Sequence, residues 1–235
     1  MATNLDFWAT RDERAAKAYW ESKGEMYRGL LADALRPLAP FASVLEIGCH
    51  SGPNLWAIRQ RWPDPVLYGV DPALKVAMFG AAMCALPSAA AVDLSGIGFF
   101  CGSAPSCFDP FGVVPIGVDE HGVGPCDKAT LPDVDVIVSC YTLAYLTPEQ
   151  LDRTLARMSD TAQKGIILAE PMDLFVMGAP LEWDSGLRPS VPMRESQPIP
   201  WKHDYSARLL RLGWQVTQRK FPGVDMLDGI VIASR

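Results

Sequence analysis

Short apolar runs alternate with amphipathic segments along the chain. Four of the runs read "SVLEIG", "VLYGV", "VDVIVSC" and "GIILAEP". Continuous runs of this kind are typical of strands buried on both faces. The segments between them, "NLWAIRQRW", "PALKVAMFGAAMCAL" and the stretch after "TPEQ", have the composition and spacing of helices. The pattern predicts an α/β fold in which helices cover both faces of a parallel sheet.

Several helix boundaries follow from capping signals. Thr147 and Gln150 match a capping box, and Pro148 suits the first helical turn, so we expect a helix from there to about Ala162. Pro72 stands at the predicted start of the helix that follows "VLYGV".

The segments outside the central α/β pattern are predicted to be a helical lid at the N-terminus, and a long loop and a strand pair towards the C-terminus. Residues 1–40 are predicted to be a helical lid, divided near Gly24 into two helices. Residues 172–200 are rich in proline and lack periodicity, which predicts a long loop on the substrate side. The runs "WQVTQRKF" and "GIVIASR" are joined by too short a link for a crossover helix, so they should pair antiparallel. We expect one domain over residues 1–235.

Composition narrows the class of protein. The chain has 235 residues, a net charge of −6 and a sequence pI of about 5.1, which disfavours binding to long nucleic acids. Charges interrupt the start "MATNLDFWATRDER", and no stretch approaches the ~20 apolar residues of a membrane span. We therefore expect a cytoplasmic protein without membrane association.

The six cysteines include no CxxC pair, so free thiols are expected. Cys107, His121 and Cys126 form the only loose cluster of metal-ligand types, and their spacing does not predict a metal site. The sequence leaves the oligomeric state open, a homodimer included.

The turn after the first strand carries the first candidate chemistry. In "VLEIGCHSGPNL", Gly48 and Gly52 allow a tight turn and a close approach of the backbone to a ligand. The spacing is not GxGxxG, and the chain has no GxxxxGK[ST] motif. A dinucleotide or a nucleoside triphosphate is therefore not the ligand that this turn indicates.

A combination of segments points to a known family. "VLEIGCHSGPNL", then "LYGVDP", then "VDVIVSCYTLAYL" resembles the class I S-adenosylmethionine-dependent methyltransferases. The resemblance covers roughly residues 43–170, and the two closing strands match the C-terminal hairpin of that family. It implies a Rossmann-like, doubly wound sheet of seven strands in the order 3-2-1-4-5-7-6, with strand 7 antiparallel, in a three-layer α/β/α arrangement.

The resemblance also assigns roles to residues around a bound S-adenosylmethionine. Asp71, which ends the second strand 25 residues after Glu46, would accept hydrogen bonds from both ribose hydroxyls. Glu46 would lie near the amino-acid end of the cofactor, and Asn54 would reach its carboxylate from the first helical turn. The remaining predicted contacts are Gly48, Cys49, His50, Ser51, Gly52 and Pro72. Structural roles for Glu46 and Asp71, as a satisfied buried acid and a helix N-terminal acid, stay open.

Two positions depart from the family pattern or leave a choice. His50 occupies a position that is usually glycine, and it fits if its φ is negative and its side chain points away from the cofactor. A residue after the third strand would contact the adenine amino group. Ser103 and Asp119 compete for that role, and we expect Asp119, which lies 16 residues before Asp135.

Methyl transfer is mainly a matter of positioning, so catalytic residues are hard to identify. Tyr141 follows the fourth strand and is expected to contact cofactor or substrate, and Cys140 is expected beside the cofactor as a core cysteine rather than a nucleophile. His203 is the candidate general base, with a hydrogen bond to Asp204 as its structural alternative. Glu170 is a candidate substrate ligand at the end of the fifth strand.

Other aromatic residues have two readings. Tyr19 and Trp20 resemble the aromatic lid that small-molecule methyltransferases fold over the cofactor, or they dock the first helix on the sheet. Tyr145 is expected in the core. The function indicated is methyl transfer to the oxygen or nitrogen of a small molecule.

Two alternatives stay open. One is an RNA or protein methyltransferase, which would need a basic rim; the candidates are Arg153, Arg157, Lys164, Arg188, Arg194 and Lys202. The other is a protein of the same fold that binds the cofactor without catalysis.

Overall fold

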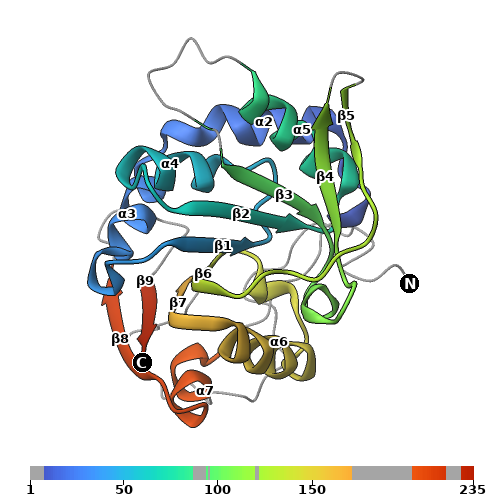
Figure 1. Ribbon diagram of the computed structural model, residues 1–235. Coiled ribbons are helices and arrows are strands. Elements are labelled where there is room, and N and C mark those ends of the chain that lie inside the picture. The colour runs from blue at the N-terminus through green and yellow to red at the C-terminus, as the bar shows by residue number, and fades with distance from the viewer. Residues whose placement is uncertain (1–7, 87–93, 95, 120–121, 171–202, 221–228) are drawn as a thin grey trace, which may run out of the picture.

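Nine strands form one mixed sheet through the centre of the protein in a computed structural model (Figure 1). The structure describes residues 8–86, 94, 96–119, 122–170, 203–220 and 229–235. The strand order is β5-β4-β3-β2-β1-β6-β7-β9-β8. The strands are β1 (Ser43–Ile47), β2 (Val66–Asp71), β3 (Ile97–Cys101), β4 (Val114–Asp119), β5 (Gly122–Pro125), β6 (Val134–Cys140), β7 (Ala162–Ala169), β8 (Gln215–Lys220) and β9 (Gly229–Ser234).

Helices cover both faces of the sheet. One face carries α3 (Met26–Ala34), α4 (Pro53–Arg61) and α5 (Leu74–Ala85), and the other carries α6 (Pro148–Thr161) and α7 (Tyr205–Arg211). In Figure 1, α4 and α5 lie above the central strands, and α6 and α7 lie below them. The further helix α2 (Glu13–Glu21) packs on α5. Short 3-10 turns are η1 (Ser22–Gly24), η2 (Arg36–Leu38), η3 (Ser106–Phe108) and η4 (Leu143–Tyr145).

Alternate residues of the central strands supply two separate hydrophobic cores. In β1, Val44 packs with the α3–α5 layer, whereas Leu45 packs with the α6–α7 layer. In β6 the same division separates Val136 from Ile137. This period of two, with both sets apolar, explains why the strands appear as continuous apolar runs in the sequence.

The predicted seven-stranded sheet is wrong in strand number. The strands β3-β2-β1-β6-β7-β9-β8 follow the expected order, and β9 pairs antiparallel with both β7 and β8. Two more strands extend the edge beside β3, because β4 pairs antiparallel with β3 and β5 folds back on β4. This hairpin and η3 occupy the connection between β3 and β6.

Local signals placed most helix boundaries correctly. Thr147 and Gln150 form the predicted capping box of α6, and η1 separates α2 from α3 around Gly24. Pro72, by contrast, lies outside α5, which begins at Leu74. Asp71 occupies the turn before α5 instead, because its carboxylate accepts a hydrogen bond from the Ala73 amide at 2.9 Å.

Some expectations can be compared only in part with the structure. Residues 172–200, together with His121, Arg188, Arg194 and Lys202, lie outside the described residues. None of the helices in the described ranges is both long enough and apolar enough to cross a bilayer. The described residues contain no group of three or more His, Cys, Asp or Glu side chains arranged to hold a metal ion.

Neighbouring leucines of α7 test the packing of the α6–α7 layer. Leu209 is fully buried in the core, whereas Leu210 is 57% exposed. We expect Leu209→Ala to lower the free energy of unfolding by about 2–5 kcal/mol because it leaves a cavity. Leu210→Ala is the matched control and should change it by less than about 0.5 kcal/mol. Urea denaturation measures both, and equal effects would contradict the assigned packing.

Candidate active site

The strand order reverses between β1 and β6, which places a ligand site beyond their carboxyl ends. The chain continues from β1 to β2 on one side and from β6 to β7 on the other. The turn after β1 has positive φ at Gly48 (+72°) and Gly52 (+85°). A Cβ atom on Gly48 would lie 2.1 Å from Thr142 Oγ1, so only glycine fits where the two loops meet.

Three side chains form a buried chain of hydrogen bonds below this turn. Asn54 Nδ2 donates to Glu46 Oε1 at 2.6 Å, and Arg28 Nη1 donates to Asn54 Oδ1 at 2.5 Å. Glu46 lies in β1, Asn54 in the first turn of α4 and Arg28 in α3, and all three are buried. The network therefore joins the sheet to two helices of one layer.

Arg28 is a fully buried cation that is enclosed by aromatic rings. Its guanidinium carbon lies 4.7 Å from the ring centroid of Tyr19 and 4.6 Å from that of Tyr27. Its Nε donates to the Ser22 carbonyl and its Nη2 to Ser22 Oγ. No carboxylate among the described residues forms an ion pair with Arg28, although a buried charge normally requires an opposite partner.

Glu46, like Arg28, is a buried charged side chain whose polar contacts are incomplete within the described residues. Its Oε2 atom is buried and accepts no hydrogen bond from the described residues. Burial raises the pKa of Glu46 to about 7, although the hydrogen bond from Asn54 and the charge of Arg28 oppose the shift. The carboxylate is therefore ready to gain an ammonium or hydroxyl partner from a ligand.

Asp71 ends β2 beside the glycine turn. Its Oδ2 accepts a hydrogen bond from the His50 amide at 2.9 Å, and its Oδ1 accepts one from the Ala73 amide at 2.9 Å. Burial raises the pKa of Asp71 to about 6, while these two amide bonds oppose the rise. Each oxygen keeps a further lone pair with which a ligand hydroxyl can bond.

The N-terminal helix α2 lies across the glycine turn. Ser51 Oγ donates to the Ala16 carbonyl at 2.9 Å, and the rings of Tyr19 and His50 have centroids 4.4 Å apart. His50 has a φ of +50°, so the expected negative φ is wrong. Burial, with the nearby charges of Arg11 and Arg28, lowers the pKa of His50 to about 4. The ring is therefore neutral at pH 7 and packs under the helix.

The segment after β6 forms the opposite side of the site. Tyr141 has a φ of +54°, a conformation that non-glycine residues rarely adopt. Ring centroids of Tyr141 and Tyr145 lie 6.2 Å apart, and those of Tyr145 and Trp8 lie 5.1 Å apart. Tyr145 is half-buried among these rings rather than enclosed in the sheet core.

Glu170 holds this segment in place and is not oriented as a substrate ligand. Its carboxylate accepts hydrogen bonds from Ser139 Oγ at 2.7 Å and from the Leu143 amide at 3.0 Å. It also accepts from the Thr142 amide at 2.9 Å and from the Ala144 amide at 3.3 Å. These hydrogen bonds occupy both carboxylate oxygens, so the suggestion that Glu170 binds a substrate is corrected to a structural role.

The fold is similar to those of several solved methyltransferases. An O-methyltransferase family protein from Burkholderia thailandensis aligns with a TM-score of 0.65 at 15% identity, over 99% of this chain and 63% of that one. Human N-acetylserotonin methyltransferase aligns with a TM-score of 0.58 at 15% identity, over 99% of this chain and 55% of that one. Magnesium protoporphyrin IX methyltransferase from Synechocystis PCC 6803, with bound SAM, aligns with a TM-score of 0.55 at 13% identity, over 95% of this chain and 82% of that one.

The chain has the class I methyltransferase fold. It spans less than two thirds of the length of the Burkholderia and human proteins. No protein-family profile matches the chain, and no curated protein matches it in sequence.

Within this methyltransferase fold, the choice of Asp119 as the adenine contact is wrong. β4 runs antiparallel to β3, so Asp119 at the end of β4 lies at the opposite edge of the sheet from Asp71. The third strand of the fold is β3, and its last residue, Cys101, pairs with Asp71. Ser103 follows at the correct edge, because the Gly102 amide donates to the Asp71 carbonyl at 3.0 Å.

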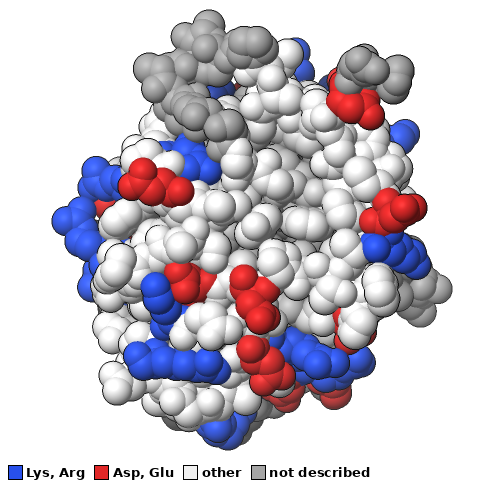
Figure 2. Space-filling view, viewed as in Figure 1, with Lys and Arg blue, Asp and Glu red and all other residues white. Residues whose placement is uncertain are grey.

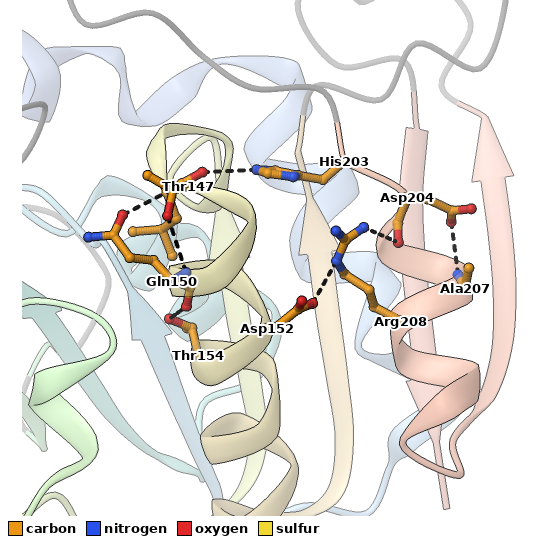
Figure 3. A network of polar contacts seen from close by, with 9 residues as sticks. Thr147, Gln150, Asp152, Thr154, His203, Asp204, Ala207 and Arg208 are labelled. Atoms are coloured by element: carbon orange, nitrogen blue, oxygen red, sulfur yellow. Dashed lines mark hydrogen bonds and ion pairs between the residues drawn. The ribbon is translucent and has the colours of Figure 1, made fainter. Parts of the chain in front are cut away.

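His203 lies beside the segment that follows β6, and its role as a base stays a prediction. The ring is 4% exposed, and Nε2 lies 3.0 Å from the Leu146 carbonyl (Figure 3). A carbonyl only accepts, so Nε2 carries the proton in this contact. Asp204 does not bond to His203 in the predicted manner, because its Oδ1 caps α7 at the Ala207 amide.

The two cysteines near the site are part of the core. Cys49 is 1% and Cys140 is 4% exposed. Burial raises the pKa of both thiols well above the ordinary value, so neither supplies a ready thiolate nucleophile. Cys49 contributes a backbone amide, which donates to the Val70 carbonyl at 3.1 Å.

Sequence reasoning missed Arg28, Trp8 and Arg11. Arg28 had a signal, because it lies three residues before Leu31 and seven before Leu35 and so shares their buried helix face. A lone cation on an apolar stripe indicates a buried partner. Trp8 and Arg11 precede α2 and had no periodic signal of this kind.

Glu170 offers a test of how the β6 segment is held. Glu170→Gln replaces an acceptor oxygen with an amide that points hydrogens at buried N–H groups. We expect a loss of about 2–3 kcal/mol in the free energy of unfolding, with a further loss of ligand affinity. The exposed Glu149→Gln is the control and should cost less than about 0.5 kcal/mol. Chemical denaturation that shows equal stability for both variants would exclude the structural role of Glu170.

Proposed function

We propose that the protein transfers a methyl group from S-adenosylmethionine to an oxygen atom of a small-molecule acceptor. The observation that carries this proposal is that two neighbouring buried charged side chains, Glu46 and Arg28, each lack a partner of opposite charge among the described residues. Among the residues that the structure describes, Glu46 Oε2 is a buried acceptor without a donor, and Arg28 is a buried cation that pairs with no carboxylate. An α-amino acid group, with one ammonium and one carboxylate, complements both.

The residues present fit this cofactor along its length. Glu46 would accept a hydrogen bond from the ammonium, and the guanidinium of Arg28, which also bonds to Ser22, Asn54 and Tyr19, would lie beside the carboxylate. The backbone of the turn from Gly48 to Ser51 would flank the methionine chain. Asp71 would hold the ribose hydroxyls, and Ser103 would lie on the adenine side.

The cofactor supplies a methyl group that its sulfonium activates. The chain contributes position and exclusion of water, because α2 covers the glycine turn through the Ser51–Ala16 hydrogen bond and the Tyr19–His50 contact. Tyr141, held by the turn that Glu170 orders, would face the acceptor. His203 stays the predicted base.

A small acceptor is favoured over RNA or protein. Two of the described candidates for a basic rim are ion-paired, Arg157 with Asp109 at 3.1 Å and Lys164 with Asp135 at 3.2 Å. Lys164 also lies at the amino end of β7, away from the site. Figure 2 shows positive and negative side chains interspersed over this face rather than a continuous basic surface. Three structural neighbours named as methyltransferases of porphyrin, N-acetylserotonin and mitomycin support the same choice.

Calorimetric titration with S-adenosylhomocysteine tests the proposal. We expect micromolar binding by the unaltered protein. Asp71→Ala should weaken it by about 10- to 100-fold, because charge-assisted hydrogen bonds to the ribose are lost. Asp64→Ala is the matched control, since Asp64 is exposed and lies just before the other end of β2.

The outcomes separate the alternatives. Binding that is unchanged in Asp71→Ala would remove Asp71 from the site. No binding by the unaltered protein would contradict the proposed function and favour a non-catalytic protein whose site His50 and α2 close. Binding without turnover on any acceptor would favour a cofactor-binding protein.

A further inference from the structure

The helix α2 is fixed to two of the loops that would hold the cofactor. Its Ala16 carbonyl accepts the hydrogen bond from Ser51 Oγ in the glycine turn at 2.9 Å. Ala16 is fully buried and packs with Ala73 and Val76, which follow Asp71 in the chain. The position of α2 therefore determines which of its side chains point into the proposed site.

The C-terminal turn of α2 is tied to Arg28. Arg28 Nε donates to the Ser22 carbonyl at 3.0 Å, and Nη2 donates to Ser22 Oγ at 2.5 Å. Asn54 and the hydroxyl of Tyr19 also form hydrogen bonds with the guanidinium. Four partners thus surround its five N–H groups. A carboxylate that takes two N–H groups, as carboxylates commonly do with arginine, must displace one of these partners.

The hydroxyl of Tyr19 points to the place proposed for the amino acid group. Tyr19 is half-buried as a whole, yet burial raises the pKa of its hydroxyl to about 12, so the tip of the ring is the enclosed part. The charge of Arg28 lowers this pKa and that of Glu46 raises it, so the hydroxyl lies within electrostatic range of both residues. Its ring centroid lies 4.4 Å from that of His50 in the glycine turn.

Among the four partners of Arg28, the Tyr19 hydroxyl is the one that a ligand can replace at least cost. The Ser22 carbonyl belongs to the backbone, and Asn54 is held by its hydrogen bond to Glu46 at 2.6 Å. The phenol hydroxyl is neutral and stands at the end of a side chain. A carboxylate forms the stronger, charge-assisted hydrogen bonds with a guanidinium and so outcompetes it.

We propose that the Tyr19 hydroxyl and the carboxylate of the cofactor are alternative partners of Arg28, so that the N-terminal helix competes with the cofactor for its amino acid subsite. This inference rests on the proposed function, which it extends to the control of cofactor binding. S-adenosylmethionine and S-adenosylhomocysteine carry the same amino acid group, so the competition lowers the affinity for both and favours release of the product. If Tyr19 instead served as a lid that holds the cofactor, its hydroxyl would have the opposite effect on affinity.

Calorimetric titration of Tyr19→Phe with two ligands tests the competition. S-adenosylhomocysteine has the amino acid group, whereas 5′-methylthioadenosine keeps the adenosine part and lacks it. We expect the variant to bind S-adenosylhomocysteine about 3- to 10-fold more tightly than the unaltered protein, because no tyrosine hydrogen bond has to be broken. Its affinity for methylthioadenosine should not change, because the Tyr19–Arg28 hydrogen bond persists in that complex of the unaltered protein.

Tyr27→Phe is the matched control. The ring of Tyr27 lies 4.6 Å from the guanidinium carbon of Arg28, as close as that of Tyr19 at 4.7 Å. The described hydrogen bonds of Arg28 include the hydroxyl of Tyr19 and not that of Tyr27. The control variant should therefore change the affinity for either ligand by less than about twofold.

The possible results separate this inference from the proposed function. Weaker or unchanged binding of S-adenosylhomocysteine by Tyr19→Phe would overturn the competition. An equal gain for both ligands would also overturn it, because the effect would then not depend on the carboxylate. Failure of all three proteins to bind either ligand would contradict the proposed function itself, and the inference would be lost with it.

Nuclear magnetic resonance of the unaltered protein gives a second readout. The Cζ carbon of a tyrosine ring reports on the hydrogen bonds of its hydroxyl, and Tyr19→Phe assigns the signal of Tyr19 in protein labelled with carbon-13 tyrosine. We expect this signal to shift on addition of S-adenosylhomocysteine and to stay in place with methylthioadenosine. A signal that responds equally to the two ligands would overturn the exchange of partners at Arg28.

Discussion

The buried carboxylate of Glu46, bonded on one oxygen and open on the other, is the constraint around which the site is organised. Asn54 satisfies Oε1, and Oε2 has no donor among the described residues. An unsatisfied buried acceptor lowers the free energy of unfolding by about 1–3 kcal/mol. A ligand that donates a hydrogen bond to Oε2 would remove this destabilisation. Arg28 extends the same network to a second buried charge, which makes the pair complementary to an amino acid group.

Two strained loops meet above this network. His50 and Tyr141 have positive φ; Tyr141 directly follows β6, and His50 lies three residues after β1, the two strands between which the order reverses. Strain of this kind persists only where the surroundings fix it. Asp71 holds the first loop through the His50 amide, and Glu170 holds the second through the turn that follows Tyr141. The acids therefore have distinct tasks: Glu170 supports the loop, and Glu46 and Asp71 are the acids proposed to bind the cofactor.

The sequence predicted the parts of the fold that depend on local patterns. The run "VDVIVSC" is β6 residue for residue, and the capping box at Thr147 begins α6 as expected. Asp119 shows where local patterns fail, because a strand's direction depends on its partner, and the sequence of β4 carries no sign that it folds back on β3.

The candidate site was predictable to a similar extent. Glu46, Asp71 and the glycine turn lie together because they end neighbouring parallel strands, a relation that follows from topology alone. Arg28 reaches the same place through α3, and its position on an apolar helix face is a signal of burial that the sequence carries. The positive φ of His50 had no signal, since a non-glycine residue at such a position depends on packing against Tyr19 and α2.

The titration of Glu46 tests this account most directly. Carbon-13 NMR of labelled glutamate carboxyls, with Glu46→Gln to assign the signal, gives its pKa with and without S-adenosylhomocysteine. The account predicts a value of about 7 in the free protein, because burial disfavours the charged form. In the complex it should fall by more than about one pH unit, because the ligand ammonium favours the carboxylate. The same pKa in both states would show that Glu46 does not meet the ligand, and the account would be contradicted.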